Sequence, residues 1–150
     1  MNQKSRKVLI ASDHAGVSFK DALIQSLPNW EWEDLGPSDS NSVDYPDFAV
    51  LAGQKISSGE AHRAVLICGS GIGMSIAANK INGVRAALVE NPVSARLSRE
   101  HNDANVLCLG ARIVAPEYGV EITQVWLNTP FNDETKHTQR IQKIHALEKK

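Results

Sequence analysis

The chain has 150 residues, of which 42% are hydrophobic and 22% are charged, and its formal net charge is −1 at neutral pH. This length suits one domain over residues 1–150, and the composition excludes disordered and coiled-coil proteins. A nearly neutral chain has no general attraction for nucleic acid or for anionic membranes, so we expect neither as a partner.

The elements predicted in chain order begin with a strand over 7–12 and a helix over 16–27. The next elements are strands over 31–35, 64–68, 85–89 and 105–109, which alternate with helices over 46–58, 71–80, 92–101 and 116–127. Several helices begin with proline, which suits a first helical turn because its missing N–H removes no hydrogen bond there. The last segment, about 133–149, is predicted to be an additional C-terminal helix that docks on the body of the protein or on a partner subunit.

This alternation of strands and helices predicts an α/β protein. We expect a single-domain three-layer α/β/α sandwich with a five-stranded, parallel, doubly wound sheet in the order 2-1-3-4-5. Strands 1 and 3 are then neighbours where the strand order reverses, and ligands bind beyond the carboxyl ends of such strands. Asp13 and His14 follow strand 1, and Cys68 ends strand 3. We predict that these residues face a ligand, the alternative being that Asp13 only caps a helix and His14 lies on the surface.

A glycine-rich turn runs from the third strand into a helix over residues 68–75, with the sequence CGSGIGMS. Its glycines let the backbone approach a ligand closely, and the helix N-terminus adds a positive partial charge, so the turn is predicted to bind an anion. Met74 stands where a dinucleotide fingerprint requires its third glycine, and no Walker lysine follows. The alternative is a tight turn in which glycine only relieves packing.

Cys68 lies at the mouth of this turn, where the positive end of the helix favours a thiolate that acts as a base or nucleophile. The alternative is a small apolar side chain at a strand end. Cys108 lies within a strand and is predicted to be part of the core. Two such cysteines do not make a secreted disulfide framework, and the apolar run over 8–11 is too short for a signal peptide, so we expect a cytoplasmic protein.

Further polar residues follow later elements. His101 can transfer a proton near neutral pH, whereas Asn102, at a helix end, has capping as its alternative. Arg112 follows the fifth strand at the ligand edge. In the last helix Lys136, Arg140 and Lys143 share one face, with His137 close by, and this stripe is either a phosphate anchor or a solvated basic face.

The sequence has no Cys-x-x-Cys or His-x-x-x-His pair and no Gly-x-Ser-x-Gly elbow, so we expect neither a metal site nor serine hydrolysis.

Several longer motifs resemble one family. They are Ser12-Asp13-His14-Ala15-Gly16, Asp44-Tyr45-Pro46-Asp47, Cys68-Gly69-Ser70-Gly71-Ile72-Gly73, Ile76-Ala77-Ala78-Asn79-Lys80, Ser98-Arg99-Glu100-His101-Asn102-Asp103-Ala104-Asn105-Val106-Leu107 and Gly110-Ala111-Arg112. In register over nearly the whole chain, they resemble the ribose-5-phosphate isomerase B family, which includes the galactose-6-phosphate isomerase subunits. The resemblance implies an aldose-ketose isomerase of the pentose phosphate pathway, acting on ribose 5-phosphate and ribulose 5-phosphate through an enediolate, without cofactor or metal.

The resemblance also implies roles for individual residues. Cys68 would move a proton between C1 and C2, and His101 would assist ring opening. The groups that would hold the enediolate are the Ser70 side chain and the backbone amides of Gly69, Gly71, Ile72 and Gly73. Asp13 and Tyr45 would position sugar hydroxyls or the ring oxygen, and Asn102 would bind a hydroxyl or the enediolate. The phosphate would be bound by His14, Arg112, Lys136 and Arg140. Family members are homodimers or tetramers of such dimers, and the resemblance implies that His101, Asn102 and Arg112 serve the partner's site.

Two residues depart from the family pattern. Ser70 stands where threonine is frequent and keeps the hydroxyl, whereas Lys136 stands where arginine is usual and loses the bidentate fork. A hexose 6-phosphate of the galactose or allose type is therefore an alternative substrate. A non-catalytic sensor of sugar phosphates or nucleotides is the alternative from another class of protein.

Overall fold

The computed structural model describes residues 6–148. Its strands are β1 Lys7–Ser12, β2 Glu31–Asp34, β3 Ala64–Cys68, β4 Ala86–Leu88 and β5 Val106–Gly110. Its helices are η2 His14–Gly16, a 3-10 turn, and α1 Val17–Ser26, α2 Tyr45–Ser57, α3 Ile72–Ala78, α4 Pro92–Asn102, α5 Pro116–Asn128 and α6 Thr135–His145. The predicted elements are thus confirmed to within a few residues at their ends, except that the predicted end of the last helix at residue 149 lies outside the described residues.

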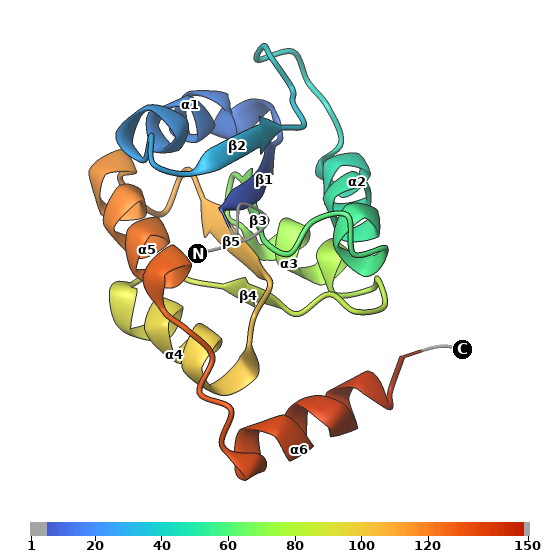
Figure 1. Ribbon diagram of the computed structural model, residues 1–150. Coiled ribbons are helices and arrows are strands. Elements are labelled where there is room, and N and C mark those ends of the chain that lie inside the picture. The colour runs from blue at the N-terminus through green and yellow to red at the C-terminus, as the bar shows by residue number, and fades with distance from the viewer. Residues whose placement is uncertain (1–5, 149–150) are drawn as a thin grey trace.

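The five strands are parallel and form one sheet with helices on both faces, which confirms the predicted α/β/α sandwich (Figure 1). Alternate residues of each central strand enter different cores. In β3, Val65 and Ile67 pack with α1, α4 and α5, while Leu66 and Cys68 pack with α2 and α3. These central strands are buried on both faces, which explains why they read as nearly continuous apolar runs.

The predicted order of the last two strands was wrong, because the sheet runs β2-β1-β3-β5-β4. The cause is the length and burial of the two strands. All five residues of β5 are buried and pair with β3 from Ala64↔Val106 to Cys68↔Gly110. The strand β4 has three residues, and the exposed Leu88 ends it, so it occupies the edge. Right-handed crossovers then place α4 on the face of α1 and α5, since the chain returns toward the centre of the sheet after β4.

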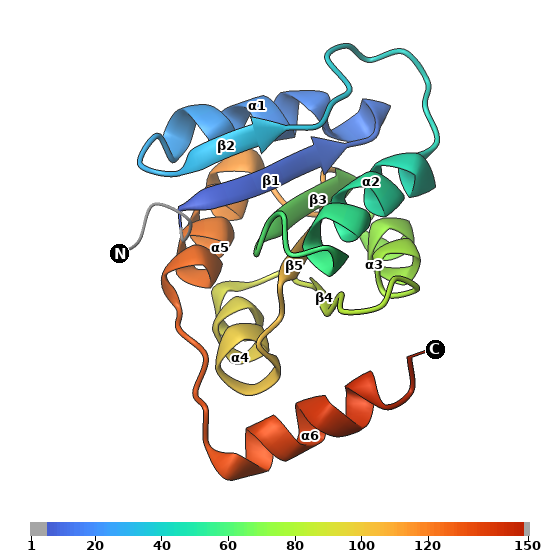
Figure 2. The same cartoon turned by 45° about the vertical axis from the view of Figure 1, so that its right-hand side comes forward.

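The helix α6 lies outside the two helical layers, alongside α4 (Figures 1 and 2). Its His137 and Ile141 are buried, while Ile144 is exposed. The structure thus places this face of α6 against α4 of the same chain. Among the described residues, no helix combines the length and the apolar character needed to cross a membrane.

Candidate active site

The glycine-rich turn folds around the Cys68 sulfur. The Gly71 amide donates a hydrogen bond to Cys68 Sγ at 3.1 Å, and Gly71 adopts φ of 77°, a left-handed conformation that favours glycine. The Cys68 side chain is 4% exposed, while Gly69 and Ser70 beside it are half-buried. This hydrogen bond fixes the position of the Cys68 sulfur at the start of the turn.

The remaining amides of the turn are not all free for a substrate. The Ile72 amide donates to Ser70 Oγ at 3.3 Å, and the Gly71 amide is bonded to Cys68. The predicted oxyanion site formed by the consecutive amides of the turn is therefore partly used inside the turn itself. The Ser70 hydroxyl still keeps its proton to donate, because its oxygen is the acceptor in the bond with Ile72.

Two predicted substrate-binding side chains lie directly against the turn. A Cβ on Gly73 would stand 2.4 Å from Tyr45 Cζ, and a Cβ on Gly69 would stand 3.0 Å from Arg112 Nη1. The Arg112 amide also donates to the Gly69 carbonyl at 2.9 Å. A side chain at residue 73 would therefore displace the Tyr45 ring, and the structure places Tyr45 and Arg112 beside the turn that holds Cys68 within one chain.

Asp13 and His14 lie beside this turn because β1 and β3 are neighbours. The Asp13 amide donates to the Ile67 carbonyl at 2.9 Å, and its carboxylate accepts from the Ala15 amide at 2.9 Å, so Asp13 does cap η2. The Val43 amide donates to His14 Nδ1 at 3.3 Å, which ties the imidazole to the loop that follows β2. These bonds orient both side chains at the carboxyl edge of the sheet.

The other predicted site residues lie on the side of the sheet where the strands begin, opposite to the carboxyl ends that hold Cys68. Because α4 runs antiparallel to the strands, His101 and Asn102 at its end lie near the amino end of β5, away from Cys68. Lys136 and Arg140 belong to α6, which packs on α4. One chain thus separates the predicted site into a Cys68 group and a His101 group. The Cys68 group consists of Asp13, His14, Tyr45, Cys68, Gly69, Ser70, Gly71, Ile72, Gly73 and Arg112; the His101 group consists of His101, Asn102, Lys136 and Arg140.

His137, which was not predicted as a site residue, packs directly against His101. Its ring stacks on His101 with the ring centroids 4.5 Å apart and the planes 10° apart. Burial lowers the pKa of His137, and the neighbouring His101 lowers it further. The sequence places His137 beside Lys136 on the predicted helix, but spacing alone could not show which face of that helix packs on α4.

Cys108 belongs to the core, and the described residues contain no metal-binding cluster. Cys108 is fully buried, and burial raises the pKa of its thiol, which confirms that it is part of the core. Within residues 6–148, histidine, cysteine and acidic side chains form no group of three that could hold a metal ion.

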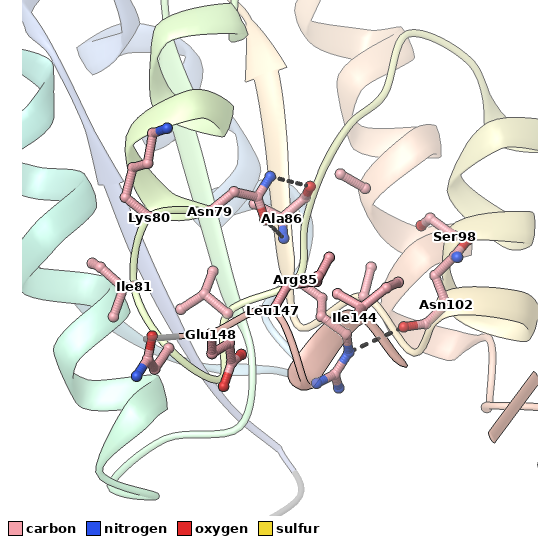
Figure 3. Close-up of a pocket in the computed structure, with 14 residues that line it drawn as sticks. Asn79, Lys80, Ile81, Arg85, Ala86, Ser98, Asn102, Ile144, Leu147 and Glu148 are labelled. Atoms are coloured by element: carbon pink, nitrogen blue, oxygen red, sulfur yellow. Dashed lines mark hydrogen bonds between the residues drawn. The ribbon is translucent and has the colours of Figure 1, made fainter. Parts of the chain in front are cut away.

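A cavity of about 700 Å³ lies between the α3–β4 connection and the ends of α4 and α6 (Figure 3). Ile81, Arg85, Ile144 and Leu147 line it. Of the predicted site residues, all of which the structure describes, Asn102 alone lines it. This cavity therefore borders the His101 group and does not contain the Cys68 turn.

Comparison with known proteins identifies a family and related structures. The model of a family described as Ribose/Galactose Isomerase matches residues 8–144. Ribose-5-phosphate isomerase B of Escherichia coli (strain K12) is 38% identical over 147 residues, covering 97% of this chain and 98% of that protein. A structure of Trypanosoma brucei type B ribose 5-phosphate isomerase is 45% identical with a TM-score of 0.91, covering 95% of this chain and 99% of the other. A structure of ribose-5-phosphate isomerase B from Mycoplasma genitalium with bound ribulose-5-phosphate is 39% identical with a TM-score of 0.89, covering 93% and 94%.

Proposed function

Since the chain belongs to the Ribose/Galactose Isomerase family, we propose that it interconverts ribose 5-phosphate and ribulose 5-phosphate in the cytoplasm, with residues 1–150 acting as one isomerase domain. The observation that carries this proposal is the Cys68 sulfur, which accepts the Gly71 amide at the carboxyl edge of β3, beside Arg112 and Asp13. The related structure that holds ribulose-5-phosphate supports the choice of substrate.

The proposed reaction is a proton transfer between adjacent carbons. The Cys68 thiolate removes the proton from C2 of the open-chain aldose, and the C2–H electron pair forms the enediolate C=C bond while negative charge develops on O1. The Ser70 hydroxyl donates a hydrogen bond to that oxygen. The O2 proton passes to O1, and the Cys68 thiol returns its proton to C1 as the C2=O2 double bond forms, which gives the ketose and regenerates the thiolate. Atoms and charge balance without any cofactor.

The complete site requires a second copy of the chain in this proposal. His101 and Asn102, for ring opening and for hydroxyl binding, lie at the wrong edge of the sheet to reach Cys68 of their own chain. Arg112 lies against its own Gly69, so we assign it to the same chain as Cys68. The partner would supply the whole His101 group, and the phosphate would lie between His14 and Arg112 of one chain and Lys136 and Arg140 of the other.

The surface around the Cys68 turn suits such a partner. Ile72, Ile76, Leu88 and Ile113 are all exposed there. Leu88 and Ile113 are close to the turn, because a Cβ on Gly71 would stand 2.7 Å from Leu88 Cδ1 and a Cβ on Gly110 would stand 3.0 Å from Ile113 Cγ1. Exposed apolar groups gathered in this way are typical of subunit interfaces, which supports a homodimer or a tetramer of dimers.

The test of the activity compares kcat/KM on ribose 5-phosphate, galactose 6-phosphate and allose 6-phosphate, together with deuterium exchange from solvent into C2. We expect turnover and exchange with the pentose phosphate to exceed those with either hexose phosphate. A preference for a hexose phosphate would move the assignment to that sugar, and binding of ribose 5-phosphate without exchange would identify a sensor.

A further inference from the structure

Arg85 lies where three parts of the fold meet, immediately before β4, and its side chain is 15% exposed. Its Nε donates to the carbonyls of Asn102 at 3.1 Å and Asp103 at 3.0 Å, which are at the end of α4. Its Nη1 lies 2.8 Å from Nε2 of His145 in α6. A guanidinium can only donate, so the imidazole nitrogen of His145 accepts. One side chain thus joins β4, α4 and α6 (Figure 3 shows its bond to Asn102).

Asp103 reinforces the end of α4. It adopts φ of 44° and ψ of 43°, a conformation in which few residues other than glycine are found. Its carboxylate is held from both sides, by Arg99 Nη1 at 2.7 Å and by Arg85 Nη2 at 3.1 Å. Arg85 Nη2 also donates to the Asp103 carbonyl at 2.8 Å. These bonds fix the residue that directly follows His101 and Asn102.

The attachment of α6 uses contacts spread along its length. At its start, His137 stacks on His101. Near its end, His145 accepts from Arg85, and just beyond it Glu148 Oε1 accepts from the Gly83 amide at 2.7 Å. The cavity beside Ile144 and Leu147 leaves this end of α6 without close apolar packing on that side. Polar tethers therefore decide where the end of the helix lies.

We propose that Arg85 is a positioning residue that fixes α6, with its phosphate-binding Lys136 and Arg140, relative to His101 and Asn102. This inference rests on the proposed function for the reaction it serves. The Arg85 guanidinium has two separate effects. The bond to His145 sets the place of the phosphate-binding cations, and the bonds to Asn102 and Asp103 set the place of the groups that act on the sugar.

The experiment compares His145→Ala with His145→Gln, whose amide oxygen can still accept from Arg85, and with Arg85→Lys, which keeps the charge but loses the fork. We expect His145→Ala to raise KM for ribose 5-phosphate about tenfold with kcat nearly unchanged, because it weakens binding of substrate and transition state alike. His145→Gln should restore most of the KM. Arg85→Lys should raise KM and also lower kcat. Arg96→Lys is the matched control, since Arg96 pairs with Glu100 on the exposed face of α4, and it should change neither constant.

Hydrogen exchange of the amides of residues 135–145 gives a readout that does not depend on activity. We expect faster exchange over these residues in Arg85→Lys and His145→Ala than in the unchanged chain and in Arg96→Lys, since a lost tether permits local opening. Unchanged exchange would show that Arg85 does not hold α6, and a uniform change over the whole chain would show that Arg85 serves only general stability; either result would overturn the proposal. If the unchanged chain does not isomerise ribose 5-phosphate, the proposed function fails, and the exchange measurement still decides whether Arg85 fixes α6.

Discussion

The Cys68 group and the His101 group are built in different ways. Around Cys68 the backbone makes most of the contacts: the Gly71 amide bonds the sulfur, Tyr45 packs against Gly73, and a short turn joins β3 to α3. Around His101 most of the contacts are made by side chains, among them Arg85, Arg99 and His137. The group holding the proposed base is therefore shaped by local backbone geometry, while the group holding the proposed phosphate anchor depends on packing between helices.

The largest expected effect separates the two cysteines. Cys68→Ala removes the proposed base, so we expect kcat to fall by about a thousandfold, within the usual range for loss of acid–base catalysis, while ribose 5-phosphate still binds. Cys108→Ala should keep kcat and cost only about 1 kcal/mol of stability from lost core packing. The assays are steady-state turnover and deuterium exchange at C2. Retained exchange in Cys68→Ala would remove this residue from the chemistry.

A smaller effect is expected from the cations of α6. Arg140→Ala should raise KM for ribose 5-phosphate about tenfold, because a charge-assisted bond to phosphate is lost. Lys136→Arg should lower KM about threefold, since the guanidinium fork can bind phosphate with two hydrogen bonds. Both are measured by steady-state kinetics. If neither variant changes KM, the basic face of α6 is solvated and does not belong to the site.

The dependence of the Cys68 turn on its close packing with Tyr45 can be tested by adding a side chain at Gly73. Gly73→Ala places a Cβ 2.4 Å from Tyr45 Cζ, so the ring must move, and we expect a loss of about 1–3 kcal/mol in the free energy of unfolding. The same substitution in a Tyr45→Ala chain should cost much less, because the ring is absent. Denaturant unfolding of the four chains measures this difference. Equal losses in both backgrounds would show that the turn does not depend on Tyr45.

The smallest effect concerns pH and the stack of His101 on His137. Because burial lowers the pKa of His137 below its ordinary 6.5, the unfolded chain takes up this proton first as the pH falls. The contribution of His137 to stability is therefore present above about pH 6.5 and is lost as the pH falls toward the lower folded pKa. His137→Phe keeps an aromatic ring and removes the titration, so its Tm should fall less between pH 7.5 and 5.5. Identical slopes of Tm against pH would contradict this role.

The sequence predicted the layers and the turn around Cys68 because both depend on local signals. Apolar runs marked the buried strands, and glycines marked the turn around Cys68. The order of β4 and β5 was missed because it depends on which strand completes the pairing with β3, and the short β4 gave little signal. The roles of Arg85, Asp103 and His137 were missed for a related reason. Their partners lie far along the chain, and single-chain spacing does not show how α6 meets α4.

The most direct measurement mixes two inactive variants, Cys68→Ala and His101→Ala, within the same assembly by joint refolding. If each site combines Cys68 of one chain with His101 of another, each mixed dimer regains one intact site of its two. Since about half of the dimers in an equal mixture are mixed, the mixture should recover about a quarter of the activity of the unsubstituted protein. Native mass spectrometry checks that mixed dimers form. Mixed dimers with no more activity than the separate variants would contradict a site shared between two copies of the chain.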